Sequence, residues 1–145
     1  MRKRASFSAL VCLAFLVVCR TALAQSMLER NVEVSNTQLD FANATALNVY
    51  LELPENFIIN AQVPTELVLL SSDESKTIRS PLKVGINSVT MGDVTAFSKL
   101  KGYAKIFYCE EAETSRCFLK KPKIELKNSP GLKSEQPLAI RVLPH

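Results

Sequence analysis

The sequence of 145 residues is poor in the residue types on which most catalytic sites depend. It has no tryptophan, four glycines, and a single histidine, His145, at the last position. Hydrolytic triads and most transition-metal sites use histidine, and a terminal residue is seldom held in place. Loops that cradle phosphate groups are rich in glycine. The sequence therefore carries no hydrolase or metal-enzyme signature, and we expect neither a metal ion nor another cofactor.

Long apolar runs are also lacking, apart from one near the N-terminus. Residues 2–4 are basic, residues 9–19 are mostly apolar, and small residues stand at Ala22 and Ala24. This is the three-part pattern of a secretory signal peptide. The apolar run is about half of the ~20 residues that a membrane-spanning helix needs. We therefore expect a signal peptide over residues 1–24, one domain over residues 25–145, no membrane insertion, and a periplasmic or secreted location.

Lipid attachment at Cys19 is not expected, because the bulky Val18 precedes it. The sequence Asn43-Ala44-Thr45 is an N-glycosylation sequon, which is meaningful in a eukaryotic secretory pathway.

The positive net charge belongs to the N-terminal segment. Lys and Arg number 18 against 14 Asp and Glu, but four of these cations lie before residue 25, which leaves 14 of each sign. A net charge near zero gives no case for a nucleic-acid or anionic-membrane partner.

Hydrophobic residues after residue 25 alternate with period two, which is typical of half-buried strands. In ALNVYLEL, for example, Leu47, Val49 and Leu51 fall on one face and Asn48 on the other. The segments VEVSNTQLDF, ELVLLS, INSVTM, YAKIFYC, CFLKKPKIEL and LAIRVL are further strand candidates. Because no helices alternate with them, the sequence predicts an all-β fold, an antiparallel immunoglobulin-like sandwich of about 7–8 strands. Residues 93–102 and 127–137 are expected to be loops.

The sequence has one acidic and one basic cluster, and each has a simple interpretation. Glu110, Glu111 and Glu113 lie in one short segment without the glycine and aspartate pattern of a calcium loop, so we expect a solvated loop. Four lysines flank Pro122 in a strand-like segment: Lys120, Lys121, Lys123 and Lys127. They could form an anion-binding patch, but lysine and proline also protect sheet edges, which is the interpretation we favour.

Beyond the signal segment the chain has two cysteines, Cys109 and Cys117. An even number of cysteines in an oxidising compartment indicates a disulfide, and the two positions predict a bridge across a hairpin. Closing so short a loop stabilises the fold by about 2.5 kcal/mol.

At these cysteines the chain resembles two known families. YC…CFLKKPKIEL resembles the N-terminal immunoglobulin-like domain of the periplasmic thiol:disulfide interchange protein. LELPENFIINAQVP, followed by ELVLL, YC and LAIRVL, is similar to the C-terminal β domain of thioredoxin-like proteins with NHL repeats. The first resemblance implies that Cys109 and Cys117 act as a dithiol–disulfide couple, with Tyr108 and Phe118 as shielding aromatic residues. It also implies a thioredoxin-like or membrane electron-transfer protein as partner.

The chain departs from that interchange protein in its longer, acidic loop and in lacking a double proline after the second cysteine. Carboxylates raise the pKa of a nearby thiol, whereas Arg116 and Lys120 favour the thiolate of Cys117. If either sulfur is a nucleophile, we expect Cys117.

Two function classes therefore stay open. One is a secreted or periplasmic binding or accessory module with a structural disulfide, whose partner is another extracytoplasmic protein. The other is an extracytoplasmic thiol–disulfide carrier that uses Cys109 and Cys117, so any enzymatic role is at most that of a thiol–disulfide oxidoreductase partner domain. A protease inhibitor with a constrained loop is a third class, without specific residues in its favour.

Overall fold

Eleven strands and one short 3₁₀ helix make up the part of the chain that the computed structural model describes, which is residues 31–42, 44–113, 115–132 and 136–144. The expected signal peptide, Asn43 and His145 lie outside the described residues. The strands are β1 (Val32–Ser35), β2 (Gln38–Leu39), β3 (Ala46–Glu52), β4 (Phe57–Ile59), β5 (Glu66–Ser71), β6 (Thr77–Pro81), β7 (Gly85–Thr90), β8 (Lys99–Glu110), β9 (Cys117–Lys120), β10 (Lys123–Asn128) and β11 (Leu138–Val142). None of the described helical segments is long and apolar enough to span a membrane.

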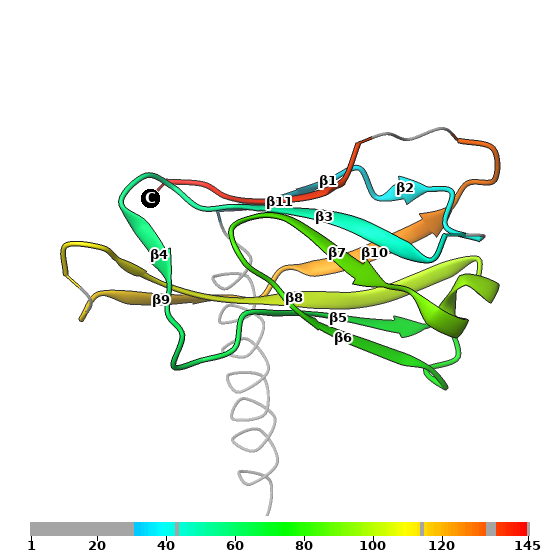
Figure 1. The fold of residues 1–145 in the computed structure, drawn as a ribbon, viewed down its shortest axis with the longest axis horizontal. Coiled ribbons are helices and arrows are strands. Elements are labelled where there is room, and N and C mark those ends of the chain that lie inside the picture. Colours follow the sequence, from blue (N-terminus) through cyan, green and yellow to red (C-terminus); the bar gives the residue numbers. More distant parts are fainter. Residues whose placement is uncertain (1–30, 43, 114, 133–135, 145) are drawn as a thin grey trace, which may run out of the picture. The chain divides into compact units, whose positions relative to one another are not determined.

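The strands form two sheets (Figure 1), which confirms the predicted all-β sandwich. The four-stranded sheet has the order β1-β11-β3-β7. The seven-stranded sheet has the order β2-β10-β8-β5-β6, with β4 and β9 also paired to β8. Most pairings are antiparallel, as expected, while β11 with β3 and β10 with β2 are parallel.

The strand number exceeds the expected seven or eight because two predicted strands are each divided and because two short strands, β4 and β6, were not predicted. Asn36 adopts a positive φ of 58° between β1 and β2, so the opening segment leaves one sheet and joins the other. Its side-chain Nδ2 donates a hydrogen bond to the carbonyl of Pro137 over 3.0 Å. Pro122, which has no N–H to donate, lies in the break between β9 and β10.

The hydrophobic core lies between the two sheets. In β3, Leu47, Val49 and Leu51 are buried and Asn48 is exposed, as the alternation predicts. In β8 four of the even-numbered residues are buried in this core: Leu100, Ala104, Ile106 and Tyr108. Each buried leucine- or valine-sized side chain stabilises the fold by about 1.5–3 kcal/mol, so this core is the main source of stability.

β8 is the central strand of the larger sheet. β5 and β4 pair along one of its sides and β10 and β9 along the other. It begins at Lys99, so the prediction of a loop over residues 93–102 is wrong: a 3₁₀ helix covers Gly92–Ala96 and the last four residues are strand. The strand extends this far because Leu100 continues the buried alternation of β8.

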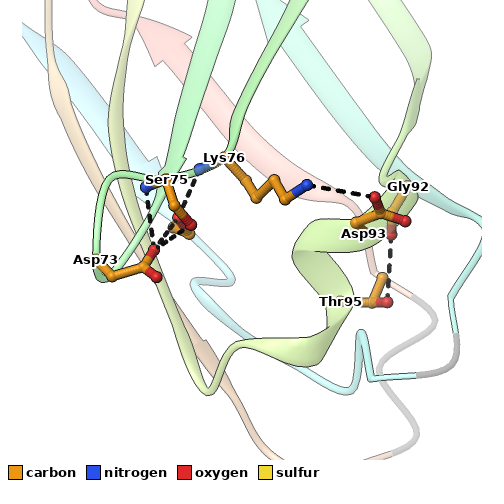
Figure 2. Close-up of polar contacts among 7 residues, drawn as sticks. Asp73, Ser75, Lys76, Gly92, Asp93 and Thr95 are labelled. Atoms are coloured by element: carbon orange, nitrogen blue, oxygen red, sulfur yellow. Dashed lines mark hydrogen bonds and ion pairs between the residues drawn. The ribbon is translucent and has the colours of Figure 1, made fainter.

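Polar contacts hold the turn between β5 and β6 (Figure 2). The carboxylate of Asp73 accepts hydrogen bonds from the hydroxyl of Ser71 at 2.6 Å and from the Oγ and backbone N–H of Ser75 at 2.8 and 3.1 Å. These bonds lower the pKa of Asp73 to about 2. Lys76 then forms an ion pair of 3.6 Å with Asp93, which joins the turn to the 3₁₀ helix.

Candidate functional site

The cysteines predicted to form a bridge do so. Cys109 in β8 and Cys117 in β9 are direct partners in the strand register, with an S–S distance of 2.03 Å and a Cα–Cα distance of 4.0 Å. The next pair of residues in the register is Glu110 and Arg116. The N–H of Glu110 donates a hydrogen bond of 3.0 Å to the carbonyl of Arg116. The cysteines therefore occupy a non-hydrogen-bonded position, where antiparallel backbones approach most closely.

The two sulfurs differ in accessibility. Cys109 is only 1% exposed, whereas Cys117 is half-buried. Because residue Cys117 is the more exposed of the two, an approaching thiolate would reach it first.

Asn60, which the sequence analysis did not select, contacts the bridge. Its Nδ2 lies 3.2 Å from Sγ of Cys109 and 3.9 Å from Sγ of Cys117. Its backbone N–H donates to the carbonyl of Phe107, and its Oδ1 accepts from the N–H of Gln62 at 2.8 Å. The hydrogen bond from Gln62 to the side chain of Asn60 forms an Asx turn. The sequence Asn-Ala-Gln after an apolar run could have indicated this motif.

Tyr108 and Phe118 lie on the sheet face opposite the sulfurs, because neighbouring residues of a strand point to opposite faces. Their rings stack at 5.5 Å between centroids, and Phe57 of β4 packs edge-on against both at 5.4 and 5.9 Å. Burial raises the pKa of Tyr108, and its hydroxyl has no hydrogen-bond partner among the described residues. The geometry gives these two aromatic residues a packing role within the core.

Arg116 is exposed and forms an ion pair of 3.3 Å with Glu110. Its guanidinium is thereby engaged by a carboxylate beside the bridge. Glu111 and Glu113 are exposed, as expected of a solvated loop. Within the described ranges no group of three or more histidine, cysteine, aspartate or glutamate side chains is placed to hold a metal ion.

The hairpin has an open groove on one side and an apolar surface on the other. The groove, of about 680 Å³, is lined by Pro54, Glu55, Phe57, Glu110, Arg116, Phe118 and Pro144. On the sulfur-bearing face, Ile58 pairs with Cys109 and Leu119 pairs with Phe107. Ile58 and Leu119 are each 41% exposed, so one large apolar side chain lies beside the bridge on β4 and another on β9.

The lysines near Pro122 do not share one environment. Lys121, Lys123 and Lys127 are exposed, and Lys121 lies 4.0 Å from the ring centre of Tyr103. Lys120 is 7% exposed and points inward beside Ile106, so burial lowers its pKa and it does not protect an exposed edge. Among the described strands, β9 pairs with β8 alone, and β2 covers only the last two residues of β10.

Comparison with known proteins gives no functional assignment: the chain matches no family model, and no curated protein is significantly similar to it in sequence. Its function is therefore inferred from the geometry of the hairpin.

Proposed function

We propose that the protein is a periplasmic or secreted β-sandwich module that binds another extracytoplasmic protein through the sulfur-bearing face of the β8–β9 hairpin. In this proposal Cys109–Cys117 is a structural bridge. The observation that carries it is the pair Ile58 and Leu119, two exposed aliphatic side chains beside the disulfide, one opposite Cys109 on β4 and the other two residues after Cys117 on β9. The signal-peptide pattern of residues 1–24 supports the location.

In the strand register Ile58 and Leu119 belong to a group of adjacent apolar positions, which we call the apolar strip. Phe107 and Cys109 are alternate residues of β8 and point to the same face, with Leu119 opposite the first and Ile58 opposite the second. Exposed apolar side chains that are scattered singly have no special meaning, but a contiguous group is typical of a binding surface. The disulfide fixes the two strands at this point, so this face loses little conformational freedom when a partner binds it.

The environment of the sulfurs supports a structural bridge. Cys109 is almost completely covered, and the nearest arginine, Arg116, is paired with Glu110. A working couple needs a thiolate that is exposed and stabilised by positive charge.

One observation favours the carrier as a second candidate. A partner thiolate that attacks the half-buried Sγ of Cys117 would break the S–S bond and release Cys109 as a thiolate. Asn60 already donates a hydrogen bond to that sulfur at 3.2 Å, which would stabilise the leaving thiolate. The second thiol of the partner would then attack the mixed disulfide, leaving the partner oxidised and this protein as a dithiol.

The redox state of the bridge separates the two candidates. The native protein is incubated with reduced thioredoxin, and free thiols are counted by alkylation and mass spectrometry. We expect the bridge to stay oxidised, because structural disulfides have potentials below about −300 mV. Rapid reduction would favour the carrier, as would a mixed disulfide formed when the Cys117 thiolate of a Cys109→Ser variant attacks the disulfide of oxidised thioredoxin and releases its second sulfur as a thiolate.

Binding is tested by site-specific photo-crosslinking in the cells from which the protein comes. A photoreactive amino acid replaces Leu119, and the matched control replaces Ile86, an aliphatic residue of β7 in the other sheet that is 67% exposed. We expect a discrete protein adduct from position 119 that is weakened by Ile58→Ser. An adduct from position 86 alone would contradict the proposed face.

A further inference from the structure

The outer face of the seven-stranded sheet carries an excess of positive charge. The register places alternate residues of β5, β6, β8 and β10 on this face, and Lys121 joins them through its contact with Tyr103. In the described residues, the cations of this face are Arg79, Lys99, Lys101, Lys105, Lys121, Lys123 and Lys127, and its carboxylates are Glu66 and Glu125.

Both carboxylates already have cationic partners. Glu66 pairs with Arg79 at 3.3 Å, and Glu125 pairs with Lys99 at 2.7 Å. The pKa of Glu125 is lowered first by the hydrogen bond from Lys99 and further by the charges of Lys127 and Lys101. On this face the lysines therefore outnumber the carboxylates.

The other sheet shows no such excess. On its outer face Arg141 of β11 lies between Glu33 of β1 and Glu52 of β3 in the strand register, and it pairs with Glu52 at 3.0 Å. A net charge near zero over residues 25–145 thus hides an excess of positive charge on one face of the larger sheet.

We infer that this lysine face binds an acidic, extended polypeptide segment of the partner protein. The inference rests on the proposed function, because the lysines continue the apolar strip: Lys105 lies two residues before Phe107, and Lys121 two residues after Leu119. Side chains on one face of a strand repeat at about 7 Å, and those of an extended peptide do the same. Carboxylates at alternate positions of such a peptide match this spacing.

Two features favour a polypeptide over a nucleic acid. The ring of Tyr103, in the middle of the lysines, is covered by the ammonium group of Lys121 at 4.0 Å, so a base could stack there only after displacing it. Apart from Arg79, which is held by Glu66, the cations of this face are lysines, which lack the planar fork that favours phosphate. A second copy of this chain is disfavoured because its own lysines would face these lysines.

The test measures fluorescence anisotropy of a labelled ten-residue peptide of alternating Glu and Thr, with the Gln and Thr peptide as its uncharged control. The purified protein is expected to bind only the acidic peptide and to lose most of that binding at about 1 M salt, where charges are screened beyond ~3 Å. Lys101→Glu with Lys121→Glu should weaken binding about tenfold or more. Lys76→Glu with Lys83→Glu makes the same charge change away from this face and should change it less than about twofold. Circular dichroism checks that both variants are folded.

Equal weakening by the two variants, or no binding of the acidic peptide, would overturn the inference. So would a higher affinity for heparin or for single-stranded oligothymidylate that depends on Lys101 and Lys121, because the face would then recognise another polyanion. In each case an adduct from position 119 would leave the proposed binding module intact. An acidic peptide that binds without any adduct from position 119 would instead refute the proposed apolar contact and retain the lysine face.

Discussion

Asn60 donates a hydrogen bond of 3.2 Å to the sulfur of Cys109, although 49 positions separate the two residues. The same residue binds the carbonyl of Phe107 through its backbone N–H. The end of β8 is therefore fixed from two sides, by the segment after β4 and by the disulfide to β9. Because β4 and β9 also pair with β8 through backbone hydrogen bonds, the disulfide reinforces a structure that other contacts already define.

Removal of the bridge should accordingly cost little. We expect Cys109→Ser with Cys117→Ser to lower the free energy of unfolding by about 1–3 kcal/mol, since the bridge closes a short loop. The far-ultraviolet circular dichroism spectrum should remain that of a β protein. Urea denaturation with and without the substitutions gives the difference, and loss of cooperative unfolding in the double variant would show that the core depends on the bridge.

The sequence contained enough information to predict the sandwich and the disulfide. The alternation of Leu47, Val49 and Leu51 is a local signal, and tertiary packing did not override it. The cysteine pair is also local, because eight positions separate its members. By contrast, β4 and β6 were not predicted. β4 has only three residues, too few to show a period, and β6 reads TIRSP, with one large apolar residue.

The details of the site depend on contacts that sequence patterns do not carry. The contact of Asn60 with Cys109 joins two distant segments and could not be found from spacing. The opposite placement of Tyr108 and Cys109 was available from strand alternation, but the family resemblance suggested shielding instead. The net charge did not indicate the lysine face, because it averages over both sheets. The period-two spacing of Lys99, Lys101 and Lys105 could have indicated that these lysines share one face of a strand.

Gly102 should be among the least replaceable residues of β8. A Cβ at this position would collide with the backbone carbonyl of Val68 on the neighbouring strand β5. Because that carbonyl belongs to the sheet, relief would require the strands to separate. We expect Gly102→Ala to lower the free energy of unfolding by about 2 kcal/mol or more, and Lys101→Ala, one residue away and exposed, to change it by less than about 0.5 kcal/mol. Equal urea midpoints for the two variants would contradict the close approach of β5 and β8.

Tyr108 buries a hydroxyl that has no partner among the described residues. A polar group in this state has lost its hydration without gaining a hydrogen bond, so its removal should be favourable. We expect Tyr108→Phe to raise the free energy of unfolding by about 1 kcal/mol and to keep the ring contacts with Phe57 and Phe118. Tyr103→Phe, on the outer face, serves as the control and should have little effect. Destabilisation by Tyr108→Phe, measured by urea denaturation, would indicate that the hydroxyl is bonded in solution.

The turn at Asp73 should contribute to acid sensitivity, and the sign follows from its pKa. In the folded protein three hydrogen bonds to the carboxylate lower this pKa from 3.8 to about 2. The unfolded chain therefore takes up a proton at a higher pH than the folded chain does, so stability falls as the pH decreases through this window. The contribution of Asp73 is complete above about pH 4 and is lost towards about pH 2.

Asp73→Asn removes this titration while it keeps an oxygen that can accept hydrogen bonds from Ser71 and Ser75. We expect the urea midpoint of the wild-type protein to fall more steeply than that of Asp73→Asn as the pH decreases from about 4 to about 2. Glu74→Gln is the matched control, because Glu74 is the next residue and its side chain accepts none of these bonds. The urea midpoint of Glu74→Gln should follow that of the wild-type protein. If Asp73→Asn and the wild-type protein lose stability in parallel, the hydrogen bonds to Asp73 do not persist in solution, and other carboxylates cause the acid sensitivity.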